Sequence, residues 1–371
     1  MKYAFTQEHD DLRGLVREFL IEVSPESEVR RLMETREGFD AGVWKQLGQE
    51  LGIVGLAIPE QYGGLGQGFA AVGVVLEESG SALLCAPYFS SVVLAGSALT
   101  GTDDEDAKRD YLPRLATGEL RGTLAVAEDN GRPDLSGVEL RARRVHGQWV
   151  LDGHKSYVID GATAQLILVA ARSEAGLSLF AVESGAPGLI ARALSTLDLT
   201  RKQARLGFDS VPARLIGVEG NAEPVLSRVL DLAALGLAAE QAGGAARTLD
   251  MAVEYAKVRF QYGRAIGSFQ AIKHKCADML LDVECARSAA YQGLWATDDD
   301  SADLALAASV AKSRCSDAFT HCAYENIQIH GGIGFTWEHP AHLYLRRAKS
   351  TQLLYGDSAY HRTRLASLIG A

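Results

Sequence analysis

The chain has 371 residues, of which 47% are hydrophobic and 23% charged; this length is enough for about two or three domains with sizeable cores. A formal net charge of -10 argues against a nucleic-acid-binding surface, which needs clustered Lys and Arg. Five scattered cysteines without a C-x-x-C pair indicate a reduced, cytoplasmic setting. We expect no signal peptide, no membrane span and no metal site.

Residues 1–118 are predicted to form an N-terminal helical domain. Leu12, Val16 and Leu20 lie on one apolar face at helical spacing, and Ser24-Pro25 should end that helix. Glycines and a proline in the segment Pro59-Glu60-Gln61-Tyr62-Gly63-Gly64-Leu65-Gly66 predict a loop.

Residues 119–221 are predicted to form a middle β domain. Short alternating or apolar runs recur there, and His146-Gly147 indicates a turn between two of them. About six or seven such strands favour a small barrel or sandwich.

Residues 222–371 are predicted to form a C-terminal helical bundle. No proline occurs between Pro224 and Pro340, which favours long packed helices. The predicted spans are 225–257, 268–296, 301–330 and 341–367. Asp298-Asp299-Asp300-Ser301 should form the break between the second and third helices.

Three spaced motifs stand in this C-terminal part of the chain. They are Arg259-Phe260-Gln261-Tyr262-Gly263, Ser268-Phe269-Gln270-Ala271-Ile272, and Gln328-Ile329-His330-Gly331-Gly332-Ile333-Gly334-Phe335. Their order and spacing resemble the flavin-binding half of the acyl-CoA dehydrogenases. That resemblance, which runs end to end, implies an α+β fold of helical domain, small β-barrel or sandwich, and four-helix bundle.

The resemblance also implies which residues bind FAD. The matching Arg259 would contact the pyrophosphate, because a guanidinium is a fixed fork for phosphate oxygens. Gln328 and the backbone at Gly331 and Gly332 would contact the adenosine side, since glycines let a ligand approach the backbone closely. Tyr262 maps to an aromatic residue near the flavin ring and Gln270 to a recurring polar position. Taken singly, each could instead be a surface charge or an ordinary turn.

The catalytic glutamate of the family is missing from both places where it is usually found. Tyr355 stands at the common position before the last helix, and Ala233 stands at the alternative position on the first bundle helix. A phenol with a pKa near 10 is a poor base at neutral pH. The candidate acids nearby are Glu240 and Asp357; their alternatives are a structural, hydrogen-bonded Glu and a helix N-cap. Tyr355 itself stays a low-ranking catalytic candidate.

The β domain also departs from the family on the side of the flavin ring. A threonine that contacts the ring in relatives is Ala127 here, and the family's Trp-Ile-Thr is Tyr157-Val158-Ile159. The elements for the pyrophosphate are therefore retained, whereas those for the ring and the base are not.

This division predicts a subunit of a heteromeric enzyme, because each FAD site of the family uses two chains. In heteromeric members, known from bacterial steroid side-chain degradation, one subunit provides the base and the other the pyrophosphate contacts. We expect α,β-desaturation of an acyl-CoA with a base-bearing paralogue, and an electron-transfer flavoprotein as acceptor. The alternatives are a self-sufficient homo-oligomer using Glu240 or Asp357, and a non-catalytic scaffold without flavin.

Overall fold

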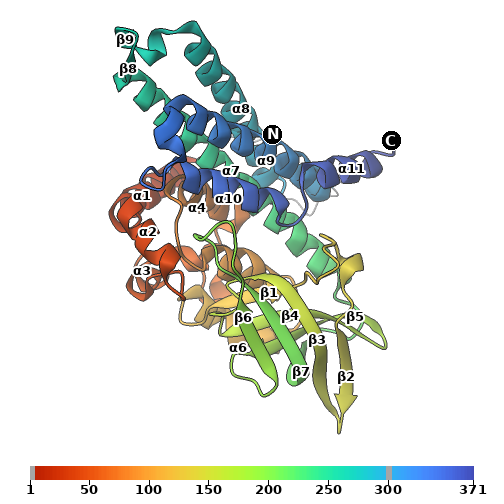
Figure 1. Cartoon of the computed structure of the whole chain (residues 1–371). Coiled ribbons are helices and arrows are strands. Elements are labelled where there is room, and N and C mark those ends of the chain that lie inside the picture. Colours follow the sequence, from red (N-terminus) through yellow and green to blue (C-terminus); the bar gives the residue numbers. More distant parts are fainter. Residues whose placement is uncertain (1–4, 298–302) are drawn as a thin grey trace. The chain divides into compact units, whose positions relative to one another are not determined.

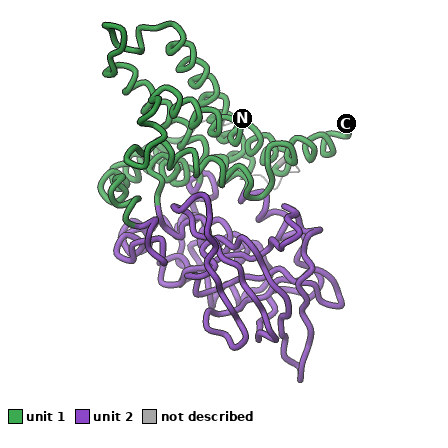
Figure 2. The backbone as a smooth tube through the Cα atoms, in the orientation of Figure 1, with its two compact units in different colours: residues 1–31, 73–84, 234–371 green, residues 32–72, 85–233 purple. Residues whose placement is uncertain are grey.

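The computed structural model describes residues 5–297 and 303–371. The predicted acidic break at Asp298-Asp299-Asp300-Ser301 lies outside the described residues. The chain divides into two compact units, coloured separately in Figure 2. We call residues 1–31, 73–84 and 234–371 the helical unit, and residues 32–72 and 85–233 the barrel unit.

Seven strands form one sheet in the barrel unit, as the alternating pattern predicted (Figure 1). They are β1 (Gly122–Ala125), β2 (Arg141–Val145), β3 (Gln148–Ile159), β4 (Leu166–Ser173), β5 (Gly176–Glu183), β6 (Leu189–Ala193) and β7 (Gln203–Ile216). The order is β1-β4-β2-β3-β7-β5, β6 pairs with β7, and β5 pairs back onto β4. That last pairing closes β4, β2, β3, β7 and β5 into a barrel, while β1 and β6 each pair with a single strand of it.

Alternation places one face of each strand inside the barrel. The core includes Leu151, Val169, Phe180, Leu206 and Val211, all fully buried. The predicted turn between β2 and β3 is confirmed: His146 and Gly147 both take positive φ values, 50° and 81°. Two such residues in succession form the turn type that joins twisted antiparallel strands.

The N-terminal part of the chain is helical. The longer elements are α1 (Gln7–Val23), α2 (Glu26–Glu34), α3 (Ala41–Lys45), α4 (Gly68–Ala82), η4 (Phe89–Gly96), α5 (Ser97–Thr100) and α6 (Glu105–Ala116). Helix α1 ends at the Ser24 cap before Pro25, as predicted, and buries Val16 and Leu20.

The C-terminal helices are α7 (Glu223–Val258), α8 (Gln270–Trp295), α9 (Asp303–His330), α10 (Ala341–Leu353) and α11 (Ser358–Leu368). A two-strand hairpin, β8 (Phe260–Gln261) and β9 (Arg264–Ala265), follows α7, and a short helix, η7 (Gly331–Phe335), follows α9. Helices α4 and α7 can cross closely because glycines lie at the contact. A Cβ at Gly80 would lie only 2.0 Å from the Glu240 carbonyl oxygen, and one at Gly243 only 1.8 Å from that of Glu77. None of the described helices combines the length and hydropathy that a bilayer-spanning segment needs.

One predicted helix is wrong: residues 341–367 form two helices, not one. Helix α10 ends at Leu353, its cap residue Leu354 is extended (ψ 131°), and Tyr355 and Gly356 then take φ values of 57° and 98°. Asp357 starts α11 by accepting a hydrogen bond from the backbone N–H of Tyr360 at 2.8 Å. The Lys312 side chain, distant in the sequence, binds carbonyl groups of this break. Local helix propensity alone could therefore not predict the break.

Candidate functional site

The first predicted site motif lies at the C-terminal end of α7. Residues 260–265 form the β8–β9 hairpin, and its two-residue turn, Tyr262-Gly263, has φ values of 52° and 78°. The Tyr262 side chain is 93% exposed. A tyrosine that adopts a left-handed backbone conformation and buries almost none of its ring is available to a ligand or another chain.

The second motif lies at the end of α9 and in η7, and an aromatic stack connects it to the first. The Tyr255 ring of α7 stacks on His330 of α9, with ring centroids 4.2 Å apart. Tyr255 also accepts, through its carbonyl, the backbone N–H of Arg259 at 2.9 Å. Arg259 and the turn after His330 therefore lie at the same end of the helical unit. Burial lowers the pKa of His330, which favours the neutral ring in this stack.

The residues at this end of the unit fit an FAD pyrophosphate and adenosine. A Cβ added at Gly331 or Gly332 would meet no atom within 4 Å, so the space beside this backbone is open to a ligand. A glycine is favoured at position 331 because the backbone there has a φ of 64°. At position 332, packing among the described residues does not require a glycine. The exposed Arg259 guanidinium has no ion-pair partner within the described part of the chain, and the exposed Gln328 amide has no hydrogen bond there. These groups can therefore bind an anionic dinucleotide.

Gln270 lies at the first turn of α8, beyond the hairpin. Its amide is 3.3 Å from the His274 imidazole, and its side chain is exposed. Arg264 places its guanidinium 4.1 Å from the centre of the neighbouring Phe269 ring. This segment therefore presents polar groups at the same hairpin that carries Tyr262.

The first candidate base, Glu240, is part of a buried ion pair. Its Oε1 accepts a hydrogen bond from Arg347 Nη1 at 2.7 Å, and both side chains are 2% exposed. A buried carboxylate paired in this way is stabilised in its charged form. Abstracting a substrate proton would neutralise Glu240 and leave the buried guanidinium without its counter-charge.

The other two candidates lie together at the break between α10 and α11. Asp357 is the N-cap of α11. This is the structural role that was the alternative to a catalytic one. Tyr355 is partly buried, and its carbonyl oxygen lies 2.9 Å from His361 Nε2. Lys312 Nζ donates to the carbonyls of Gln352 and Gly356 at 3.1 Å and 3.0 Å.

The barrel unit contains the two predicted departures on the ring side. The Ala127 carbonyl accepts the Ser156 N–H at 2.9 Å, and Tyr157 is 53% exposed with a φ of 57°. The hydroxyl of Ser156 also donates to Asp129, whose carboxylate pairs with Arg205 at 2.8 Å. The Ser156 hydrogen bond is the main reason that the pKa of Asp129 is lowered.

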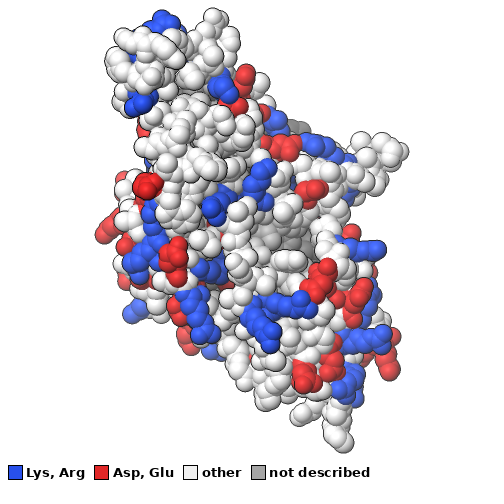
Figure 3. All heavy atoms as spheres, viewed as in Figure 1, with Lys and Arg blue, Asp and Glu red and all other residues white. Residues whose placement is uncertain are grey.

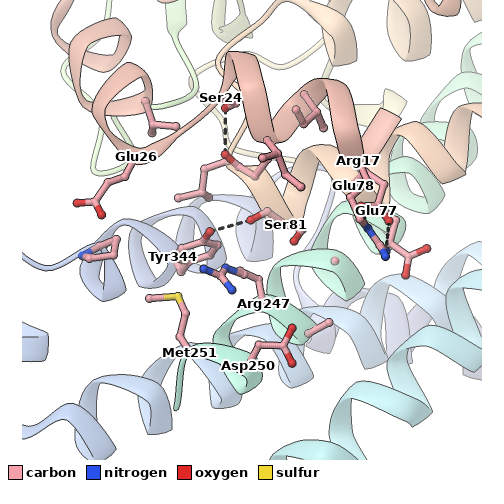
Figure 4. A pocket seen from close by; sticks show the side chains of 18 of the residues that line it. Arg17, Ser24, Glu26, Glu77, Glu78, Ser81, Arg247, Asp250, Met251 and Tyr344 are labelled. Carbon is pink, nitrogen blue, oxygen red and sulfur yellow. Dashed lines mark hydrogen bonds and ion pairs between the residues drawn. The ribbon is translucent and has the colours of Figure 1, made fainter. Parts of the chain in front are cut away.

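A separate cavity of about 600 Å³ lies within the helical unit (Figure 4). Arg17 and Glu78 form an ion pair at 2.8 Å on its wall, and the Tyr344 hydroxyl donates to the Ser81 carbonyl at 2.7 Å. None of the residues predicted for the FAD site or for the base lines it. On the face shown in Figure 3, acidic and basic side chains are interspersed.

Three residues that support these candidates, Lys312, Arg347 and His361, were not predicted from the sequence. Lys312 and Arg347 are fully buried charges in helices. A charge on the apolar face of a predicted helix is the signal that could have found them.

The fold and the open, cationic end of the helical unit define a dinucleotide-binding protein of mixed helix and barrel architecture. Models of the acyl-CoA dehydrogenase N-terminal, middle and C-terminal domains match residues 6–119, 123–211 and 224–369. Acyl-CoA dehydrogenase IpdE2 of Mycobacterium tuberculosis is 33% identical over 351 residues, covering 94% of this chain and 93% of that protein.

Two solved structures are similar over the whole chain. A variant of the Tcur3481-Tcur3483 steroid ACAD has a TM-score of 0.90 at 31% identity, covering 98% of each chain. The ChsE4-ChsE5 complex from Mycobacterium tuberculosis has a TM-score of 0.92 at 29% identity, covering 100% of this chain and 99% of that one. The chain belongs to the acyl-CoA dehydrogenase family, whose members are oxidoreductases that bind FAD.

Proposed function

We propose that this chain is the pyrophosphate-binding subunit of a heteromeric acyl-CoA dehydrogenase that desaturates an acyl-CoA thioester between its α and β carbons. A paralogous subunit provides the base, and the two chains share each FAD. The observation that carries this proposal is the state of the three base candidates. Glu240 is held in a buried ion pair with Arg347, Asp357 caps a helix, and the remaining position is a tyrosine.

In this proposal the chain's own residues bind and orient the cofactor. Arg259 pairs with the pyrophosphate, while Gln328 and the backbone at Gly331 and Gly332 hold the adenosine side. Tyr262 packs its exposed ring against the shared site. When bound, FAD accepts a hydride from the β carbon of the substrate. The α-proton is removed by the partner, because a phenol, with an ordinary pKa of about 10, is a poor base.

The similar structures support a two-chain assembly, since the names of both solved relatives join two components. The substrate is an acyl-CoA and the electron acceptor an electron-transfer flavoprotein, as in the family. A steroid acyl group is the choice that the Tcur3481-Tcur3483 relative favours.

Flavin stoichiometry tests the proposal. The chain is purified alone and together with co-expressed candidate paralogues from its native source, and flavin absorbance is measured per chain. We expect little flavin on the chain alone and a stable flavin-loaded complex with one paralogue. About one flavin per chain in the protein alone would support the self-sufficient homo-oligomer instead. Absence of flavin from every assembly would support the scaffold.

Variants assign the roles in that complex. Removing the glutamate of the paralogue should abolish flavin reduction by acyl-CoA, whereas Asp357→Asn in this chain should leave it within several-fold. A loss of about 10²–10⁴ from the Asp357 change, with flavin still bound, would place the base here and refute the division of roles.

A further inference from the structure

The segment 352–357, between α10 and α11, adopts a backbone conformation that its own sequence does not favour. Tyr355 has a φ of 57°, and a left-handed backbone conformation is unfavourable for a residue with a side chain. Such residues persist only where the surroundings fix them. The groups that fix this segment must therefore lie outside it.

Two side chains from the helices α9 and α11 bind three carbonyl groups of this segment. Lys312, on α9, donates to the carbonyls of Gln352 and Gly356. His361, on α11, holds the carbonyl of Tyr355 between them. Three carbonyls that a continued helix would have paired internally thus have side-chain partners here, and the Leu353 carbonyl accepts the Gly356 N–H at 3.3 Å.

Lys312 depends on the segment as much as the segment depends on Lys312. The side chain is 0% exposed, and no carboxylate of the described residues forms an ion pair with it. Its third proton goes to Ser316 Oγ at 3.1 Å. Ser316 in turn bonds Gln241, which reaches Thr351 of α10 at 3.1 Å. These three hydrogen bonds of the amine therefore all go to neutral oxygen atoms.

The electrostatics agree with this geometry. Burial lowers the pKa of Lys312 to about 7, against the weaker attraction of Asp357 and Asp317. Burial, with a contribution from Lys312, likewise lowers the pKa of His361 to about 4. A neutral His361 donates through Nε2 to the Tyr355 carbonyl, which fixes the tautomer of the ring.

We propose that Lys312 is a positioning residue, which fixes segment 352–357 and therefore sets where the side chain at position 355 is presented. The inference rests on the proposed function in one respect only: the family resemblance puts position 355 at the reacting end of the substrate. Lys312 itself is too deeply buried to contact substrate or flavin. It acts through the two carbonyls that it binds, whichever side chain stands at 355.

The test compares two fully buried lysines. Lys312→Met keeps the length of the side chain but removes all three donors, and Lys155→Met is the matched control, because Lys155 is 0% exposed and bonds Glu128 at 2.7 Å in the barrel unit. Amide hydrogen exchange of residues 351–356 is measured by mass spectrometry, with thermal unfolding recorded for each variant. We expect Lys312→Met to speed exchange there by about tenfold or more, since it removes hydrogen bonds from a charged donor. Lys155→Met should lower the melting temperature and leave that exchange within about twofold.

A third variant separates positioning from simple loss of stability. Lys312→Gln retains an N–H donor, so exchange in the segment should fall between the wild-type chain and Lys312→Met. If Lys312→Met does not fold, the comparison of Lys312→Gln with Lys155→Met decides alone. Unchanged exchange at 351–356 in a folded Lys312 variant would refute the positioning role. The measurement needs no flavin, so its outcome is independent of whether the heteromer is found.

Discussion

The buried pair of Glu240 and Arg347 gives the sharpest prediction, because it separates a structural acid from a catalytic base. Glu240→Gln preserves the size of the side chain and removes its charge. Arg347 then keeps a guanidinium that is 1% exposed and has lost the carboxylate 2.7 Å away. Breaking a buried pair from one side costs about 3–5 kcal/mol.

A change of this size is easy to measure. It should lower the melting temperature by roughly 5–10 °C, given the entropy of unfolding for a unit or chain of this length. Circular dichroism on heating, or unfolding in urea, gives the value directly. Glu240→Gln combined with Arg347→Met removes both charges and should recover most of the loss, because the two changes are coupled.

The kinetic result decides the role of Glu240. In the assembled, flavin-loaded enzyme we expect Glu240→Gln to reduce the flavin at a rate within several-fold of the wild-type rate. A loss of about 10²–10⁴ in a variant that still folds and binds flavin would identify Glu240 as the base. An unchanged melting temperature would refute the ion-pair argument itself.

Four further predictions follow from the site. Arg259→Ala should weaken FAD binding by the assembly about tenfold or more, whereas Arg192→Ala, at an exposed position of β6, should not; equal affinities in a flavin titration would remove Arg259 from the site. Asp357→Ala should cost about 1 kcal/mol of stability and Asp357→Asn very little, because asparagine also caps helices; equal losses in urea unfolding would argue against capping. Lys312 and His361 have folded pKa values, about 7 and about 4, below the ordinary 10.5 and 6.5. The unfolded chain therefore binds more protons from about pH 4 to 6.5 and from about pH 7 to 10.5, and the free energy of unfolding should rise with pH in both windows. Lys155, whose pKa is lowered by burial to about 8, adds to the upper window, so a Lys312→Met variant whose upper rise is not reduced would contradict this. Light scattering with FAD present should show a stable assembly of two or four chains, since a shared site needs more than one; a monomer at micromolar concentration counts against sharing.

The fold was predictable because its signals are local. The alternation of the strands, the His146-Gly147 turn and the Ser24-Pro25 stop each lie within a few residues of the feature they specify. The Tyr262-Gly263 turn and the Gly331-Gly332 pair are equally local, so the sequence indicated where backbone could be presented to a ligand. The assignment of those residues to FAD remains a prediction.

The parts that sequence could not predict depend on contacts between distant residues. Glu240 meets Arg347 across 107 positions, and Lys312 meets Gly356 across 44. No periodicity in α7 or α9 specifies those partners. For the same reason the break at 354–357 was predicted as continuous helix: its cause is a lysine on a different helix.

The break itself favours a functional segment over a passive scaffold. A continuous helix over 341–367 would have paired its carbonyls internally and required no buried amine. The chain instead places a fully buried lysine against Gln352 and Gly356 and holds Tyr355 in a left-handed conformation. Desolvating the amine and straining the backbone both oppose folding. Features that lower stability concentrate where a protein must present a group in a fixed place. Under the proposed function, this segment is the frame that presents position 355, and the tyrosine there leaves the base to the partner subunit.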